Sequence, residues 1–193
     1  MNTAHPCITF YLGGVRAGKS ARAQAHAESI AGAQRIFIAT AQAFDDEMTR
    51  RIAKHREDRG EQWHTIEEPI AIVDAITNYM RSEQRVSGQL ATVVLIDCLT
   101  LWVSNLLLAL PETDHATQAE HRVADAARAL AALMQAHSQV HWIVVSNEVG
   151  LGVVPPTPLG RAYRDALGRA NQILAEAAEH VQLMVAGLEL RLK

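Results

Sequence analysis

Cysteine is scarce in this chain, and its nine histidines are scattered. Only two of the 193 residues are cysteines, Cys7 and Cys98, and both lie in apolar stretches. A small disulfide scaffold needs several regularly spaced cysteines, so that class of protein is excluded. The chain also has no HExxH, no CxxC and no cluster of cysteine and histidine, so we expect no structural or catalytic zinc. We interpret the two cysteines as small core residues in a reducing compartment.

Long hydrophobic runs and an excess of positive charge are absent as well. The longest apolar stretch, Leu99 to Leu110, is shorter than the ~20 residues that a membrane span needs. No charged segment followed by an apolar one opens the chain, so no signal peptide is expected. With 18 lysines and arginines against 21 aspartates and glutamates, the net charge is −3, which argues against nucleic acid as a partner. These features predict a cytoplasmic protein.

What the chain does have is a phosphate-binding motif near its N terminus. Residues 13–20 match G-x-x-x-x-G-K-[ST] in full, between an apolar run and an alanine-rich helical stretch. The glycines let backbone N–H groups converge on an anion, and the following helix directs its positive end toward it. We expect Lys19 to reach the β- and γ-phosphates of a nucleotide and the Ser20 hydroxyl to bind Mg²⁺. The predicted nucleotide-binding residues of this loop are Gly13, Gly14, Val15, Arg16, Ala17, Gly18, Lys19 and Ser20.

Apolar runs of strand length alternate with helical patterns along the whole chain. Three runs, IFIA, VVLI and WIVV, are continuously apolar, as expected for parallel strands covered on both faces. The length and the lack of a long linker indicate a single domain over residues 1–193. The expected fold is α/β, a P-loop NTPase of the RecA-like type with a mostly parallel central sheet flanked by helices. The predicted strands are 7–12, 35–40, 92–97, 140–146, 181–186 and 188–192, and the predicted helices are 20–30, 45–56, 69–82, 99–110, 116–137 and 159–180.

Two acidic residues at the ends of extended segments each have two interpretations. Asp97 ends the apolar run 92–96. An acid there, downstream of a phosphate loop, is the usual second contact to Mg²⁺, direct or through water. An aspartate before a helix is also a common helix cap, but the upstream loop favours the magnesium role. Glu67 ends a short extended piece from Trp63, and it is either a ribose or base contact or, more commonly, a solvated charge.

The segment from Asp45 to Arg59 combines acidic, apolar and basic residues. Met48, Ile52 and His55 share one face of the helix that the pattern predicts. His55 is then either a surface histidine at a helix end or a nucleophile toward a nucleotide phosphate, since neutral imidazole is a competent nucleophile near pH 7. From the residues alone the surface interpretation is the commoner one.

Beyond the loop, the chain contains the motif Ser-Asn-Glu-Val-Gly-x-Gly-x-Val-Pro at residues 146–155, which is far more specific than a phosphate loop. Together with the other motifs it resembles the bifunctional adenosylcobinamide kinase/adenosylcobinamide-phosphate guanylyltransferase family of cobalamin biosynthesis. The resemblance runs from the first apolar run to the C terminus. The matching pieces are residues 13–20, 38–41, 45–48, 55–59 with Trp63, 97–106, 145–155, 163–165 and 168–172.

This resemblance implies two successive reactions. The first phosphorylates the aminopropanol hydroxyl of adenosylcobinamide with ATP or GTP. The second transfers GMP from GTP to the new phosphate through a guanylylated histidine, which falls on His55, and it releases pyrophosphate. The resemblance also implies Mg²⁺, an acid at Asp97 and a homo-oligomer, a trimer in relatives. The further residues that it places at the nucleotide are Thr40, Ala41, Arg56, Glu57, Asp58, Arg59 and Glu67.

Three other functions remain open from the residues. One is a P-loop kinase for a different small molecule, which would form no nucleotidyl-histidine. Another is a guanylyltransferase that has lost its kinase step. The last is a non-enzymatic GTP switch or an ATP-driven assembly protein. A GTP switch should carry the guanine-reading sequence N-K-x-D, which does not occur in the chain.

Overall fold

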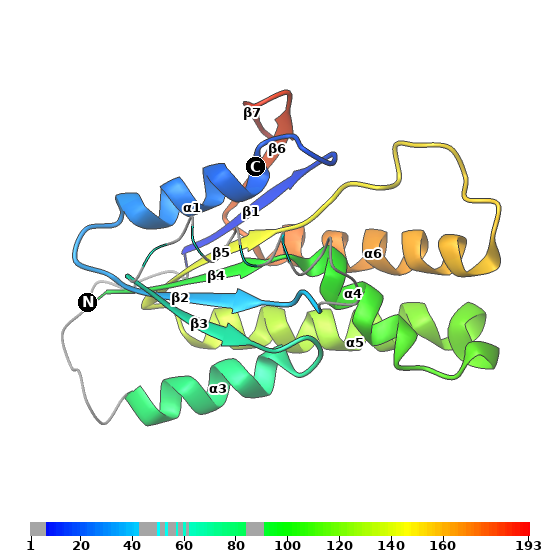
Figure 1. Ribbon diagram of the computed structural model, residues 1–193, viewed down its shortest axis with the longest axis horizontal. Coiled ribbons are helices and arrows are strands. Elements are labelled where there is room, and N and C mark those ends of the chain that lie inside the picture. Colours follow the sequence, from blue (N-terminus) through cyan, green and yellow to red (C-terminus); the bar gives the residue numbers. More distant parts are fainter. Residues whose placement is uncertain are drawn as a thin grey trace.

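The computed structural model of the protein describes residues 7–42, 50, 53, 57, 60, 62–83 and 91–193. Its strands are β1 (Cys7–Gly13), β2 (Gln34–Ala39), β3 (Trp63–Glu67), β4 (Thr92–Asp97), β5 (Val140–Val145), β6 (His180–Val185) and β7 (Leu188–Arg191). They form one seven-stranded sheet in the order β3-β2-β4-β5-β1-β6-β7 (Figure 1). All neighbours pair in parallel except β6 and β7, which form an antiparallel hairpin. The predicted mostly parallel sheet is confirmed.

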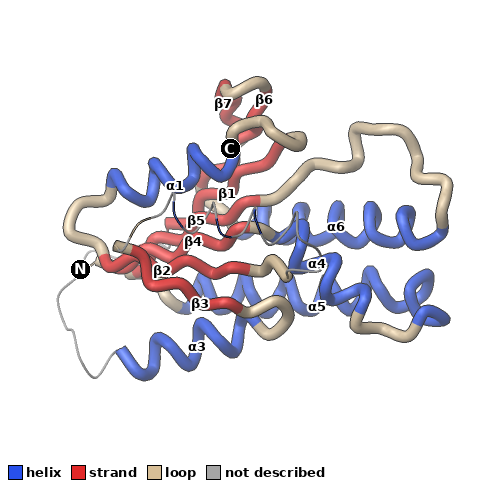
Figure 2. Tube along the Cα trace, viewed as in Figure 1, coloured by secondary structure: helices blue, strands red, loops and turns tan. Residues whose placement is uncertain are grey.

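Helices cover both faces of this sheet. Among the described helices, Figure 2 shows α1 (Lys19–Ser29) on one face and the others on the opposite face. The opposite layer contains α3 (Ile72–Glu83), α4 (Leu99–Leu108), α5 (His115–Ala136) and α6 (Pro158–Ala177), with a short 3₁₀ turn at Glu112–Asp114. Within the described ranges, none of these helices is long and apolar enough to cross a membrane.

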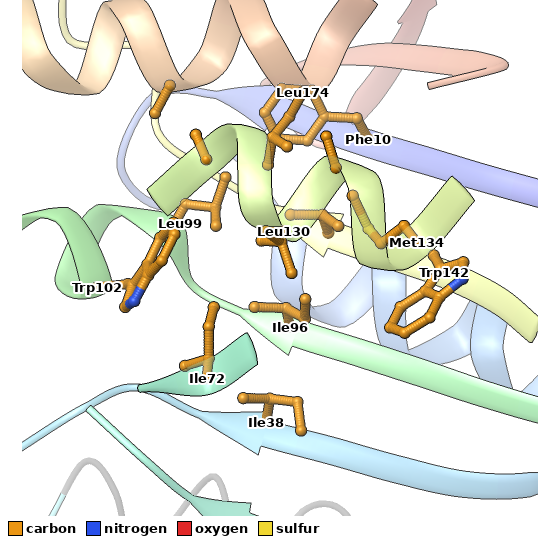
Figure 3. Packing of buried hydrophobic residues seen from close by; sticks show 14 of the residues in the cluster. Phe10, Ile38, Ile72, Ile96, Leu99, Trp102, Leu130, Met134, Trp142 and Leu174 are labelled. Atoms are coloured by element: carbon orange, nitrogen blue, oxygen red, sulfur yellow. The ribbon is translucent and has the colours of Figure 1, made fainter. Parts of the chain in front are cut away.

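The continuously apolar strands supply a core to each face. Side chains of β4 alternate, so Val93 and Leu95 pack in the cluster beneath α1, whereas Val94 and Ile96 pack in the larger cluster on the other face. Figure 3 shows this larger cluster, in which Trp142 is fully buried between the sheet and α5. Each fully buried large side chain contributes about 1.5–3 kcal/mol to the stability of the fold. The strand ends that carry polar residues therefore project from a rigid, doubly covered sheet.

The predicted helix start at Pro69 is wrong, because α3 begins only at Ile72. A carboxylate oxygen of Glu68 accepts hydrogen bonds from the backbone N–H groups of Ile70 and Ala71, at 2.9 and 2.8 Å. These bonds hold the residues after β3 in a turn, so α3 begins three residues later than predicted.

The sequence-based prediction also differs from the structure at the end of the last helix and at the segment after residue 62. The last helix ends at Ala177 rather than at residue 180, because the Glu179 N–H donates to the Ile8 carbonyl (3.0 Å) and leads the chain into β6. The extended piece from Trp63 to Glu67 is a full strand of the sheet, paired in parallel with β2. Its mixture of polar and apolar residues is typical of an edge strand, so the criterion of a continuous apolar run does not predict it.

Candidate nucleotide-binding site

The phosphate loop leaves the carboxyl end of β1 and enters α1 at Lys19. Gly18 is the helix N-cap, with φ at 92°, a left-handed conformation that glycine adopts without steric cost. Among the described residues, no side chain caps this end of α1. The N–H groups of the first helical turn thus remain available to an anion, and the helix dipole favours negative charge there.

Lys19 is the most constrained cation of the loop. Its side chain is only 7% exposed, and its ammonium donates a hydrogen bond to the Gly14 carbonyl at 2.6 Å. Burial lowers the pKa of Lys19, while the nearby Cys98 and Asp97 act in the opposite direction. An ammonium has three donors, so two remain for phosphate oxygens while the third holds the loop closed.

The strand order brings most of the predicted residues to one edge of the sheet. Strands β2, β3 and β4 all end at the same carboxyl edge as β1, as parallel pairing requires. Asp97 ends β4 and lies in register with Ala39 on β2 and Val145 on β5. Glu67 ends β3 and is exposed. This edge therefore gathers a phosphate loop and carboxylates, although contact between these residues and a nucleotide stays a prediction.

Thr40, which is predicted to contact the nucleotide, also has a structural role. It is fully buried, and its hydroxyl donates to the Cys98 carbonyl (2.8 Å) and accepts from the Cys98 N–H (3.1 Å). The amide of Asn105 donates to the Thr40 carbonyl at 2.8 Å. Thr40 thus fixes the backbone directly after Asp97, and Ala41 follows it half-buried.

Ser20 and Asp97 have the donor chemistry that Mg²⁺ prefers. Each is half-buried and offers a hard oxygen ligand. In the described part of the chain no group of three or more histidines, cysteines, aspartates or glutamates could hold a metal ion by itself. Nucleotide-bound Mg²⁺ takes only one or two protein ligands and completes its shell with phosphates and water, so the two residues fit such a site.

The predicted nucleophile lies outside the described residues. This holds for His55 and its neighbours Arg56, Asp58 and Arg59, and for most of the predicted helix 45–56. Glu57 is described and is exposed. The roles of these residues stay predictions.

The β6–β7 hairpin contacts the phosphate loop and the helix that follows it. No sequence pattern predicts this contact. The Gly187 N–H donates to the Ala17 carbonyl at 3.1 Å, and an ion pair joins Arg22 of α1 to Glu189 of β7. The sequence does predict two short runs here, but no local pattern indicates that their turn touches a loop about 170 positions earlier. The hairpin therefore holds the loop from the side opposite β5.

Two glycines of the loop should respond very differently to alanine. Gly13 has φ at +146°, and an added Cβ would lie 2.3 Å from the Met184 carbonyl oxygen, whereas a Cβ on Gly14 meets nothing within 4 Å. We expect Gly13→Ala to lower the free energy of unfolding by roughly 2–4 kcal/mol, because β1 and β6 must separate. Gly14→Ala is the matched control and should change it by less than about 1 kcal/mol. Urea denaturation of both variants checks this, and equal stability would contradict the packing of the loop against β6.

Both cysteines are free and half-buried. Burial raises the pKa of Cys7, with Glu179 adding to the effect, and burial and the charge of Asp97 raise the pKa of Cys98 to about 11. At pH 8 the native Cys98 thiol should react with iodoacetamide on the order of 100-fold more slowly than an unfolded cysteine. Mass spectrometry of alkylated native and urea-treated protein measures the two rates. Rapid alkylation of native Cys98 would show that its surroundings are not apolar.

A buried polar network joins the end of β5 to α6. The Ser146 hydroxyl donates to the Asn171 side-chain oxygen at 2.7 Å, and the Asn171 amide donates to the Asn147 carbonyl at 3.0 Å. The Tyr163 hydroxyl donates to the Thr100 carbonyl at 3.1 Å, and burial raises the pKa of this phenol. The first two residues of the motif at 146–155 are therefore held by Asn171 of α6.

The fold is shared with solved structures of low sequence identity. One of them, an ATPase domain, superposes with a TM-score of 0.58 at 14% identity, covering 92% of this chain and 69% of that one. A DnaB-like replicative helicase superposes with a TM-score of 0.57 at 13% identity, covering 93% of this chain and 47% of that one. At such low identity the likeness establishes the fold alone, and it confirms the predicted RecA-like P-loop architecture.

Sequence comparison identifies much nearer relatives. The bifunctional adenosylcobalamin biosynthesis protein CobP of Pseudomonas aeruginosa is 41% identical over 184 residues, 94% of this chain and 95% of that protein. The corresponding protein CobU of Escherichia coli is 36% identical over 189 residues, 94% of this chain and 97% of that protein. A model of the family "Cobinamide kinase / cobinamide phosphate guanyltransferase" matches residues 9–192. Because the match spans nearly the whole chain, this protein belongs to the cobinamide kinase/cobinamide phosphate guanyltransferase family.

Proposed function

We propose that this protein phosphorylates adenosylcobinamide with a nucleoside triphosphate and then transfers GMP from GTP to the product. The main support for this function is that the chain matches the family over residues 9–192 and contains a complete phosphate loop with a buried Lys19. The nucleotide and the cobinamide are substrates in this account.

In the kinase step the loop binds the triphosphate at the N terminus of α1. The acceptor hydroxyl oxygen forms a bond to the γ-phosphorus while the bond from that phosphorus to the β–γ bridging oxygen breaks. The hydroxyl proton passes to solvent water, and the nucleoside diphosphate departs. The free N–H groups of α1 and the Lys19 ammonium stabilise the charge on the phosphates. Mg²⁺, when bound through Ser20 and Asp97, neutralises further phosphate charge.

In the guanylyl step we assign His55 as the nucleophile. Its ring nitrogen bonds to the α-phosphorus of GTP, and pyrophosphate leaves. An oxygen of the cobinamide phosphate then attacks the same phosphorus, and the histidine is released as adenosylcobinamide-GDP forms. Arg56 and Arg59 supply positive charge for the attacked phosphates. The support for His55 is the family membership of the chain and its H-R-x-x-R segment.

The guanine nucleotide would lie over the ends of β2 and β3. We place Thr40, Ala41 and Glu67 near its base or ribose, together with Glu57 and Asp58. The support is the shared edge of the sheet and the exposed carboxylate of Glu67, which can accept hydrogen bonds from a ribose hydroxyl or from guanine N–H groups.

Incubation with adenosylcobinamide, Mg²⁺ and GTP tests this function. Chromatography and mass spectrometry should show adenosylcobinamide phosphate first, followed by adenosylcobinamide-GDP and pyrophosphate. Conversion to the phosphate alone would leave a kinase without the transferase. GTP turnover without any cobinamide product would favour the kinase of a different small molecule.

A further inference from the structure

The end of β5 lies between the two parts of the phosphate site. In the sheet β5 pairs with β1, which carries the phosphate loop, and with β4, which ends in Asp97. The ladder to β1 continues beyond the strand, because the Ser146 N–H donates to the Tyr11 carbonyl (2.9 Å) and the Glu148 N–H donates to the Gly13 carbonyl (3.2 Å). Asn147, between these two donors, therefore lies beside Gly13.

Side chains along this extended segment alternate between the two faces of the sheet, and this alternation indicates the face on which the Asn147 side chain lies. Val145 belongs to the apolar cluster beneath α1, and Ser146 bonds to α6 on the opposite face. Asn147 is next, so its side chain falls on the face of α1. Asp97 is in register with Val145 and shares that face, and α1 itself begins with Lys19. Asn147 thus follows a strand that lies between β1, whose loop leads to Lys19, and β4, which ends in Asp97.

The backbone of Asn147 is held by two hydrogen bonds. Its N–H donates to the Thr100 hydroxyl at 2.9 Å, and its carbonyl accepts from the Asn171 amide at 3.0 Å. Its side-chain amide takes part in no hydrogen bond within the described residues, although the residue is half-buried. A half-buried amide without a protein partner hydrogen-bonds to water, and it is therefore available to a ligand bound at this edge.

We propose that the Asn147 amide donates a hydrogen bond to the γ-phosphate of the bound triphosphate, an inference that rests on the proposed nucleotide site. A loop lysine acts on the β- and γ-phosphates, and β5 lies between the strand that leads to Lys19 and the strand that ends in Asp97, so we assign the terminal phosphate as the partner of Asn147. The hydrogen bond discriminates a triphosphate from a diphosphate. It also stabilises the γ-phosphoryl group as it moves to the acceptor hydroxyl.

Calorimetric titration with GDP and with β,γ-imido-GTP, both with Mg²⁺, tests the proposal. Asn147→Ala should weaken binding of the triphosphate analogue about tenfold and leave GDP binding within about twofold. Phosphorylation of cobinamide should fall on the order of 100-fold in turnover. Asn147→Asp keeps the side-chain size but places negative charge beside the phosphate, so it should weaken the triphosphate analogue further. Asn78→Ala, at an exposed position of α3, is the matched control and should leave both affinities unchanged.

Equal weakening of GDP and the triphosphate analogue, together with a lower melting temperature, would overturn the proposal and leave Asn147 as a structural residue. Unchanged affinities in Asn147→Ala would overturn it as well. A different result would contradict the proposed function without deciding the role of Asn147. If wild-type protein discriminates the two nucleotides but phosphorylates no cobinamide, the substrate assignment is lost, while the effect of Asn147→Ala on that discrimination still decides this inference.

Discussion

Replacement of Lys19 by alanine should abolish both reactions, with product formation reduced at least ~100-fold. The ammonium is almost fully buried at the start of α1 and has two donors left for phosphate oxygens. In the proposed mechanism both reactions use a nucleotide whose triphosphate lies in this loop, so loss of one cation should reduce phosphoryl and guanylyl transfer together. Titration with GTP and a product assay for each step measure the effect.

Arg128→Ala is the matched control for Lys19→Ala. Arg128 is an exposed cation of α5 that pairs with Asp125 on the same helix, and α5 covers the face of the sheet opposite α1. An exposed pair of this kind contributes little to stability, so we expect both activities of Arg128→Ala to stay within about threefold of the wild type. Substantial activity in Lys19→Ala with an unchanged melting temperature would show that the loop does not bind the reacting phosphates.

Replacement of His55 by alanine should separate the two reactions. Guanylyl transfer should fall by roughly 10³-fold or more, because the proposed nucleophile of the covalent intermediate is gone. Phosphorylation of cobinamide should persist, since it uses the loop and requires no histidine nucleophile. Separate assays for cobinamide phosphate and for pyrophosphate release follow the two steps.

His64→Ala provides the comparison for His55→Ala. His64 lies on β3, and its ring packs against that of Tyr79 with centroids 4.6 Å apart. Its replacement should leave guanylyl transfer near the wild-type rate. Loss of phosphorylation and guanylyl transfer together in His55→Ala would contradict a role restricted to the second step.

Local patterns were sufficient for most of the sheet and for the loop. The run Thr92-Val-Val-Leu-Ile-Asp97 is apolar because both of its faces are covered, and the predicted strand matches β4 at both ends. The glycine loop has the same strand-and-helix context in the structure as in the sequence pattern. These features depend on neighbours in the chain, which a sequence displays directly.

Features that depend on distant contacts were not predictable in this way. The bond from Gly187 to Ala17 and the network around Asn171 join segments far apart in the chain. The family resemblance predicts Thr40 as a nucleotide contact, whereas the structure shows its hydroxyl bonded twice to Cys98. The prediction of His55 as a nucleophile also depends on that resemblance, because its spacing alone favours a surface residue. Packing partners of this kind emerge only when the sheet order is known.

The most direct test of the account is to incubate the wild-type protein with GTP labelled at its α-phosphate, without cobinamide. We predict a covalent label on the protein that is labile in acid and stable in base, is absent in His55→Ala, and passes to added cobinamide phosphate. GTP labelled at the γ-phosphate should leave no label. A label that survives in His55→Ala would contradict the assignment of the histidine, and guanylyl transfer to cobinamide phosphate without any protein label would contradict the covalent mechanism.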